Sequence, residues 1–274
     1  FGIAHYGNNF ENCSCSGDVE IYAAEAEVAQ EIGGIAGVWN NGGADVVFTN
    51  CTFTGTLKTN IAVDFYYGGL VGKPYSATGT GKLIIDGYEM VANGVGLKDG
   101  EYYIQSVAGM FWFANEVNVN KNAFNGKTVK LANNIDLENA AWTPVGQTGA
   151  TTFNGVFDGQ NYTIYNLNVN SEAQTGAHYS SGLFGWVESH TAGHGHLKNI
   201  KINGATINGH HNCGALVGYI TQETALVENC HVTGATVTCT KANDDADGDK
   251  TGALIGNATV ATPVKNCTAA NSTV

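Results

Sequence analysis

Arginine is absent from this chain, and all 12 of its basic residues are lysines. Because 24 residues are acidic, the formal net charge is −12. Binding to nucleic acid needs clustered lysine and arginine side chains, so this balance argues against a nucleic-acid partner. It argues equally against binding to an anionic membrane surface. The missing arginine also weakens the case for a polysaccharide lyase or hydrolase, since such enzymes set carboxylates beside basic side chains.

Long apolar runs and prolines are scarce as well. No run of 18 apolar residues occurs, so we expect no membrane span. Proline occurs only 3 times and charged residues make up only 13%, whereas glycine occurs 37 times, which favours a β-rich chain with many turns. No signal peptide is present, but the chain begins and stops in the middle of a repeat. We therefore expect it to be part of a longer surface chain.

A short phrase, two small or apolar residues between glycine or alanine and a final glycine, recurs along the chain. The copies are Gly34-Ile-Ala-Gly37, Gly69-Leu-Val-Gly72, Gly182-Leu-Phe-Gly185, Ala215-Leu-Val-Gly218 and Ala253-Leu-Ile-Gly256. Within the first pair the final glycines are 35 residues apart, and within the last three they are 33 and 38 apart. A period of 20–50 residues is typical of stacked repeats.

A second phrase, in which asparagine precedes an apolar residue, follows every copy except Gly69-Leu-Val-Gly72, after which Lys82 takes the place of asparagine. It leads into residues of alternating polarity. Alternation with period two predicts strands. We therefore predict an all-β fold, a right-handed parallel β-helix with three strands per coil. Equivalent residues should stack in inward columns and the asparagines in a column of their own. The predicted columns are Leu167, Ile200, Cys230 and Cys267; Cys13, Cys51 and Leu83; and Asn166, Asn199, Asn229 and Asn266.

These phrases resemble the GLUG repeats of bacterial surface proteins. The resemblance rests on the glycine phrases followed by Asn-Cys and a valine-rich strand, and it covers roughly residues 1–85 and 126–274. It implies a stacked-repeat fold and an adhesin-like protein. It does not identify a ligand, because repeats of this kind are an architecture that serves many functions.

The repeats fall into two groups separated by a stretch without the glycine phrase. We predict a first segment at 1–92 and a second at 93–274, with one continuous array as the alternative. Residues 106–118 have apolar positions at helical spacing, namely Val107, Met110, Phe111, Ala114 and Val117, after a plausible N-cap at Ser106. This helix should cover the end of the second segment with these five side chains.

The seven cysteines do not form a compact disulfide framework. Cys13, Cys51, Cys230 and Cys267 occupy the inward position after asparagine, so we expect buried thiols that act as small apolar residues. Cys213 and Cys239 lie off this column, and the sequence leaves their state open.

Two groups of residues are metal candidates. Aligned on the final glycine of each phrase, His178, His211 and Asp249 fall at the same position, and imidazoles with a carboxylate can bind zinc. Asp245 and Asp247 lie in an acidic stretch that resembles part of a calcium loop, but Leu254 stands where the loop needs a bidentate glutamate. Polar loops without metal are the simpler interpretation of both groups, so we expect no cofactor, with calcium as a weak alternative.

Aromatic residues flank the glycine phrases and are candidates for binding, namely Trp39, Tyr66, Tyr67, Trp186 and Tyr219. Tyrosine and tryptophan can stack on sugars or anchor a protein partner, although they can also cover neighbouring loops. We expect a non-catalytic adhesin-like protein, extracellular or on a bacterial cell surface, that presents a rigid surface to a host protein or a glycan. The alternatives are a carbohydrate-active enzyme on a β-helix scaffold and a structural spacer.

Overall fold

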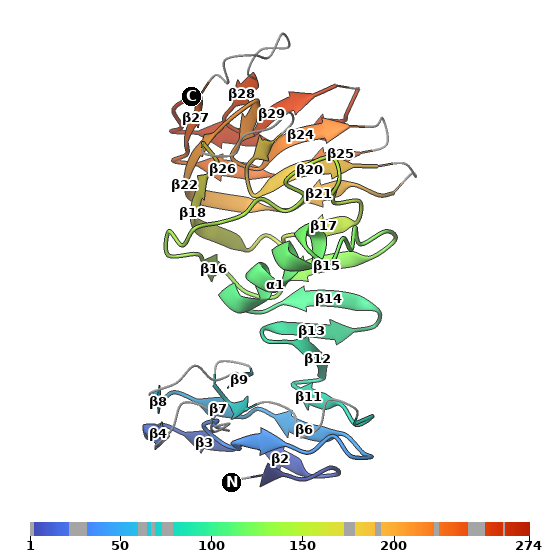
Figure 1. The fold of residues 1–274 in the computed structure, drawn as a ribbon, viewed down its shortest axis with the longest axis vertical. Helices are drawn as coiled ribbons and strands as arrows, with labels where there is room; N and C mark the ends of the chain where they lie inside the picture. The colour runs from blue at the N-terminus through green and yellow to red at the C-terminus, as the bar shows by residue number, and fades with distance from the viewer. Residues whose placement is uncertain are drawn as a thin grey trace. The chain divides into compact units, whose positions relative to one another are not determined.

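The structure, a computed structural model, describes residues 3–21, 32–59, 65–66, 69–72, 79–172, 179–189, 193–221, 225–240, 250–259 and 261–274. In these residues the chain is mostly β-strand, with one α-helix (Figure 1). It divides into two compact units, Phe1–Gly100 and Glu101–Val274, which we call unit 1 and unit 2. The sequence analysis had placed the division after residue 92. Each unit has its own cluster of buried apolar side chains.

Unit 1 consists of short strands. They are β1 (Ile3–Ala4), β2 (Asn9–Glu11), β3 (Ser14–Cys15), β4 (Val19–Ile21), β5 (Val38–Trp39), β6 (Val46–Thr49), β7 (Thr52–Phe53), β8 (Leu57–Thr59), β9 (Phe65–Tyr66), β10 (Val71–Gly72), β11 (Leu83–Ile85), β12 (Tyr88–Ala92) and β13 (Val95–Lys98). Strands β1 to β4 pair in parallel with β5 to β8, one to one and in register. The first two repeats of the sequence therefore stack as neighbours.

The later strands of unit 1 depart from this parallel pattern. Strand β11 pairs in parallel with β6, but it then turns back at Asp86 and Gly87, both with positive φ, into the antiparallel strands β12 and β13. Residues 88–98 therefore form antiparallel strands that continue from β11. Leu83 pairs with Val46 rather than standing above Cys51, so its predicted place in the cysteine column is wrong.

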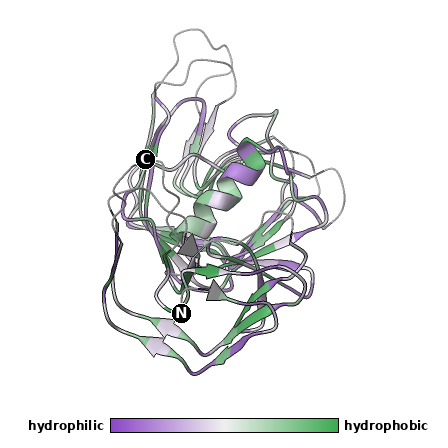
Figure 2. Ribbon diagram, turned by 60° about the horizontal axis from the view of Figure 1, so that its bottom comes forward, coloured by the Kyte–Doolittle hydropathy of each residue, from purple (hydrophilic) through white to green (hydrophobic). Residues whose placement is uncertain are grey.

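Unit 2 contains the helix and the longer strands. They are β14 (Glu101–Ile104), α1 (Val107–Asn118), β15 (Thr128–Leu131), β16 (Ile135–Asp136), β17 (Val156–Asp158), β18 (Thr163–Asn170), β19 (Ser180–Ser181), β20 (Phe184–Glu188), β21 (His196–Lys198), β22 (Lys201–Gly209), β23 (Asn212–Gly214), β24 (Val217–Thr221), β25 (Leu226–Glu228), β26 (His231–Thr233), β27 (Thr236–Cys239), β28 (Lys250–Gly252), β29 (Ile255–Ala258), β30 (Val264–Lys265) and β31 (Thr268–Ala270). Equivalent strands of successive repeats pair in parallel. Along many strands hydrophobic and hydrophilic residues alternate (Figure 2).

The repeats of unit 2 that span β17 to β29 each contribute strands to four sheets, whose pairs within these repeats are parallel, whereas the sequence predicted three strands per repeat. The difference arises at the glycine phrase, which follows one short strand and leads into another, as Ala215–Gly218 follows β23 and leads into β24. Ala215, Leu216 and Val217 are all fully buried, and three successive residues can point inward only where the chain bends.

The final glycine of each phrase is required by a close approach of backbones. A Cβ at Gly218 would lie 2.6 Å from the carbonyl oxygen of Asn212 and 2.6 Å from the amide nitrogen of Ser181 in the preceding repeat. A Cβ at Gly185 would lie 2.6 Å from the carbonyl oxygen of Gly146. The recurring glycine therefore lets the repeats stack, and its φ is not positive at either position.

Asparagines in the left-handed conformation form the corners, in two columns rather than one. The first column is Asn161, Asn199, Asn229 and Asn266, with φ between 51° and 63°. Asn166 belongs to the second column, with Gly204, Gly234 and Asn271, because Tyr165 pairs with Asn203 and Leu167 pairs with Ala205. The prediction that Asn166 and Leu167 stack with Asn199 and Ile200 is therefore wrong. Both residues belong to the next corner of the repeat.

Helix α1 begins after Ser106, whose hydroxyl accepts a hydrogen bond from the amide of Gly109, as the sequence predicted. Its buried side chains include Met110, Phe113, Ala114 and Val117. Phe113 packs against a group of core phenylalanines of unit 2, Phe124, Phe153, Phe157 and Phe184, with ring centroids 5.2–6.3 Å apart.

Two of the five predicted inward residues of α1 are not fully buried. Val107 is half-buried against the core of unit 2, and Phe111 is exposed. Phe111 is 37% exposed and lies beside Trp142, with ring centroids 5.4 Å apart. Helical spacing alone allows either Phe111 or Phe113 to lie beside the buried face, and packing against Phe124 and Phe157 selects Phe113. Positions 110, 113, 114 and 117 share one face of a helix with 3.6 residues per turn, while position 111 is about 100° away from position 110.

The four cysteines that follow a corner asparagine differ in burial. Cys51 and Cys230 are buried, whereas Cys13 and Cys267 are half-buried because they stand at the ends of their columns among the described residues. All four are free thiols in the structure. Burial raises the pKa of the Cys230 thiol to about 12.

Candidate functional site

Trp186 and Tyr219 are brought together on the outer side of one parallel sheet. They occupy equivalent positions on β20 and β24, and their ring centroids are 4.5 Å apart at an interplanar angle of 82°. Their neighbours along each strand, Val187 and Ile220, are fully buried. Strand alternation therefore turns both aromatic rings outward, and the sequence prediction named both residues.

Polar side chains from the same strands surround this pair. The indole Nε1 of Trp186 donates to Thr221 Oγ1 at 3.3 Å, and Asn257 of β29 pairs with Tyr219 as the next member of the column. Glu188 and Thr221 are equivalent residues two positions beyond the rings. We call Trp186, Glu188, Tyr219, Thr221 and Asn257 the aromatic face. The sequence prediction did not include its polar members. Glu188 and Thr221 lie two residues beyond the rings, and Asn257 aligns with Tyr219 in the next repeat, so the repeat pattern could have indicated them.

A loop closes the aromatic face on one side. Gly149 lies against the indole of Trp186, so that a Cβ there would come within 3.2 Å of Cη2. Thr152 Oγ1 donates to Glu188 Oε2 at 3.1 Å, which fixes the carboxylate beside the loop. The face therefore combines half-buried aromatic rings with hydroxyl, carboxylate and amide groups on a fixed backbone.

The other predicted aromatic residues, Trp39, Tyr66 and Tyr67, belong to unit 1. Trp39 is only 8% exposed and belongs to the core of unit 1, so the prediction that it is a surface binding residue is wrong. Trp39 belongs to β5, which pairs in parallel with β1, and its side chain packs in the core cluster of unit 1. Tyr67 and the side chain of Tyr66 lie outside the described residues.

Of the predicted metal ligands, only His211 lies within the described residues. His211 is buried, has a φ of 62° and forms a corner between β22 and β23. His178, Asp245, Asp247 and Asp249 lie outside the described residues. Within the described part of the chain, no three His, Cys, Asp or Glu side chains lie close enough together to hold a metal ion.

Several carboxylates that could be considered for catalysis serve the corners instead. Asp136 Oδ1 accepts from Asn166 Nδ2 at 2.8 Å, Asp158 Oδ1 accepts from Asn199 Nδ2 at 2.9 Å, and Asp86 Oδ1 accepts from the amide of Asn50 at 2.7 Å. Each carboxylate therefore holds a neighbouring repeat in place.

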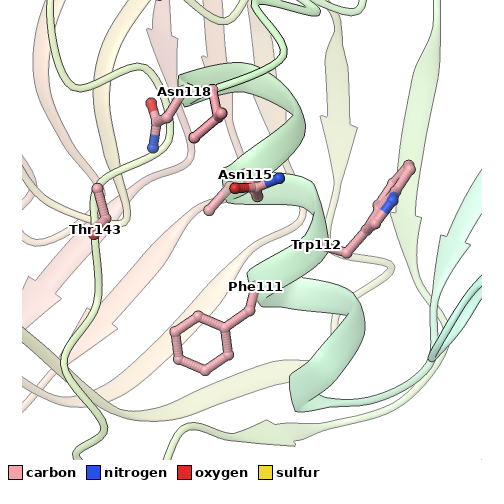
Figure 3. A pocket seen from close by; sticks show the side chains of 7 residues that line it. Phe111, Trp112, Asn115, Asn118 and Thr143 are labelled. Atoms are coloured by element: carbon pink, nitrogen blue, oxygen red, sulfur yellow. The ribbon is translucent and has the colours of Figure 1, made fainter. Parts of the chain in front are cut away.

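A second candidate is an open hollow of about 490 Å³ beside α1 (Figure 3). It is lined by Phe111, Trp112, Ala114, Asn115, Asn118, Val119 and Thr143. Asn118 already donates to the carbonyl oxygen of Pro144 at 2.9 Å and accepts from the amides of Gly146 and Gln147. Its amide therefore anchors the loop after Thr143, and the hollow offers few polar groups to orient a ligand.

Comparisons with known proteins give one partial similarity. Halomucin from Haloquadratum walsbyi is 30% identical over 139 residues, which are 48% of this chain and 1% of halomucin. The chain thus spans only a small fraction of the length of that protein. No family model matches the chain, and no solved structure matches it. In the described residues, no helix is both long and apolar enough to cross a membrane.

Proposed function

We propose that this chain is a GLUG-type repeat segment of a secreted or cell-surface protein, and that it presents a rigid binding surface without catalysing a reaction. The parallel, in-register pairing of successive repeats in both units supports this proposal. The local similarity to halomucin, whose name denotes a mucin, favours a surface location. The same pairing supports the finer proposal that the repeats wind into a right-handed parallel β-helix.

The aromatic face carries the functional part of the proposal, and a glycan is its favoured ligand. Trp186 and Tyr219 are held 4.5 Å apart by strands whose backbones cannot move independently. Aromatic rings offer apolar surface to a sugar ring, and the hydroxyl, carboxylate and amide groups of the face can meet sugar hydroxyls. A host protein anchored by the same aromatic residues is the second candidate.

A glycan array and a set of extracellular-matrix proteins, both probed with the whole chain, test this proposal. We expect glycan binding that Tyr219→Ala weakens about tenfold, which corresponds to about 1.4 kcal/mol. Tyr162→Ala is the matched control, because Tyr162 is 37% exposed and directly precedes β18, which belongs to a different sheet from β20 and β24. Circular dichroism must show that both variants fold as the parent does.

The same experiment separates the alternative functions. Binding to a matrix protein alone, with loss in Tyr219→Ala, would favour the protein ligand. Release of new reducing or unsaturated sugar ends from a bound polysaccharide would favour the carbohydrate-active enzyme. Binding that survives Tyr219→Ala would show that the ligand binds outside the aromatic face. No binding to any probe would favour the structural spacer.

A further inference from the structure

We infer that Cys213 and Cys239 form an intramolecular disulfide bond that joins two neighbouring repeats of unit 2. Their Sγ atoms are 2.8 Å apart. Non-bonded carbon atoms are optimally separated by about 3.5–4.0 Å, and sulfur is the larger atom. A disulfide bond is about 2.05 Å long, so the two sulfur atoms need to approach by less than about 1 Å.

The fold explains why these two thiols meet although they are 26 positions apart in the chain. Cys239 ends β27 and pairs with Gly209, the last residue of β22 in the preceding repeat. From Gly209 the chain turns through His210 and His211 and reaches Cys213 in β23. The side chains therefore approach across a corner, from strands of two different sheets.

The surroundings of the thiols hold this corner together. His210 Nδ1 is 2.5 Å from the carbonyl oxygen of Thr240, and His210 Nε2 contacts the carbonyl oxygen of Glu172. Thr240 Oγ1 donates to Glu172 Oε1 at 3.2 Å. Thr240, which follows Cys239, is thus bonded to His210, which lies three positions before Cys213. This arrangement places the two thiols in contact before any bond forms, which makes their reaction effectively intramolecular.

Another cysteine pair in the same unit lacks this geometry. Cys230 and Cys267 occupy equivalent positions on neighbouring parallel repeats, and the amide of Cys230 is 3.5 Å from Cys267 Sγ. Side chains at equivalent positions of parallel strands point the same way, which disfavours the torsion near 90° that a disulfide bond needs. We therefore expect a disulfide bond between Cys213 and Cys239 but none between Cys230 and Cys267.

The bond requires an oxidant, and a small-molecule disulfide such as oxidised glutathione suffices. Cys239 is half-buried and Cys213 is fully buried, so the Cys239 thiolate attacks the glutathione disulfide first. This step forms a mixed disulfide at Cys239 and releases one glutathione thiolate. The Cys213 thiolate then attacks the Cys239 sulfur and releases the second glutathione. The two cysteines lose two electrons and two protons, which the two glutathione thiols take up. An extracellular location would supply oxidising conditions.

The test compares the whole chain after equilibration in reducing and in oxidising glutathione buffers. Each sample is denatured in acid, its thiols are alkylated, and the protein is digested and analysed by mass spectrometry. We expect the oxidised wild type to carry two fewer alkylated thiols and to yield a peptide pair linked through Cys213 and Cys239. Cys230→Ala should behave as the wild type does, whereas Cys239→Ala should leave Cys213 without an intramolecular disulfide.

Thermal unfolding provides an independent measurement. The oxidised wild type should melt about 5–10 °C above the reduced form, because the bond restricts the unfolded chain. Cys239→Ala and Cys213→Ala should melt at the same temperature in both buffers. The inference is overturned if all seven cysteines of the oxidised wild type stay alkylatable, if the linked peptides join other cysteines, or if only mixed glutathione disulfides form.

Discussion

At the scale of single residues, the corner asparagines combine an unusual backbone conformation with a bond to the next repeat. Asn199 and Asn229 have φ values of 55° and 52°, a region that costs most residues about 1–2 kcal/mol but that asparagine tolerates. Asn229 Nδ2 donates to Asn199 Oδ1 at 3.1 Å, and Asn199 Nδ2 donates to Asp158 Oδ1 at 2.9 Å. The amides of Asn229 and Asn199 thus form a chain of hydrogen bonds that ends at the Asp158 carboxylate.

Replacing one corner asparagine should separate these two contributions. Asn229→Ala loses both the conformational tolerance and the side-chain bond, so we expect the free energy of unfolding to fall by about 2–3 kcal/mol. Asn229→Gly keeps the conformational tolerance and should cost about 1 kcal/mol. Urea unfolding measures both, with Asn203→Ala, at an exposed strand position, as the control. Equal losses for alanine and glycine would show that backbone conformation is not the cause.

Asp158 is the buried carboxylate at the end of this chain of hydrogen bonds. Burial alone raises its pKa, but hydrogen bonds from Asn199 and from the amide of Gln160, together with Lys198 at 3.3 Å, leave the pKa below the ordinary 3.8. Because the pKa in the folded state is the lower one, ionised Asp158 stabilises the fold fully above about pH 3.8. This stabilisation is lost as the pH falls through the folded-state pKa.

Asp158→Asn should therefore be less stable than the wild type by about 1–3 kcal/mol at pH 7, and the difference should shrink as the pH falls below about 4. Urea unfolding at a series of pH values measures the difference. Glu138→Gln is the control, because Glu138 is exposed in the same unit. A difference that stays constant down to pH 2 would contradict this role of the ionised carboxylate.

At the scale of elements, α1 supplies an apolar face to the core of unit 2. Met110, Phe113 and Val117 are at most 1% exposed and pack in the same cluster as Phe157 and Phe184 of the β-strands. Phe111, on the neighbouring side of the helix, lies instead at the open hollow (Figure 3). The helix therefore packs one side into the core of unit 2 and exposes aromatic surface on another.

Two phenylalanines two positions apart on α1 should then respond very differently to truncation. Phe113→Ala should lower the free energy of unfolding of unit 2 by about 3–5 kcal/mol, because it removes a fully buried ring. Phe111→Ala should cost less than about 1.5 kcal/mol, since it removes a half-exposed ring and its contact with Trp142. Urea unfolding followed by tryptophan fluorescence measures both. A larger loss for Phe111→Ala would show that the helix packs through its other side.

At the scale of the whole molecule, two separate cores lie in one chain. The core of unit 1 is built around Phe48 and Leu83, and that of unit 2 around Phe113 and Phe157, with no residue in common. Each repeat stabilises its neighbours through short-range contacts, so stability should be approximately local to each unit.

We therefore expect two unfolding transitions that can be shifted separately. Phe48→Ala removes a fully buried ring of unit 1 that stacks on Phe10, and it should lower the transition of unit 1 by about 3–5 kcal/mol while leaving that of unit 2 in place. Phe113→Ala should do the reverse. Differential scanning calorimetry measures both transitions. A single transition that both variants shift equally would show that the chain unfolds as one cooperative body.

The sequence by itself determined the repeat period, the strand alternation, the helix with its Ser106 cap, and the choice of Trp186 and Tyr219 as candidate aromatic residues beside the glycine phrases. These features depend on local periodicity, and equivalent positions of equal repeats stack whatever the details of packing. The tertiary structure alone decided the features that depend on how the chain bends. Two left-handed corners per repeat look alike in sequence, so only strand register assigned Asn166 to the second one. Likewise, only the packed core showed that Phe113 rather than Phe111 faces inward, that Trp39 is buried, and that Cys213 meets Cys239, because each depends on neighbours distant in the chain.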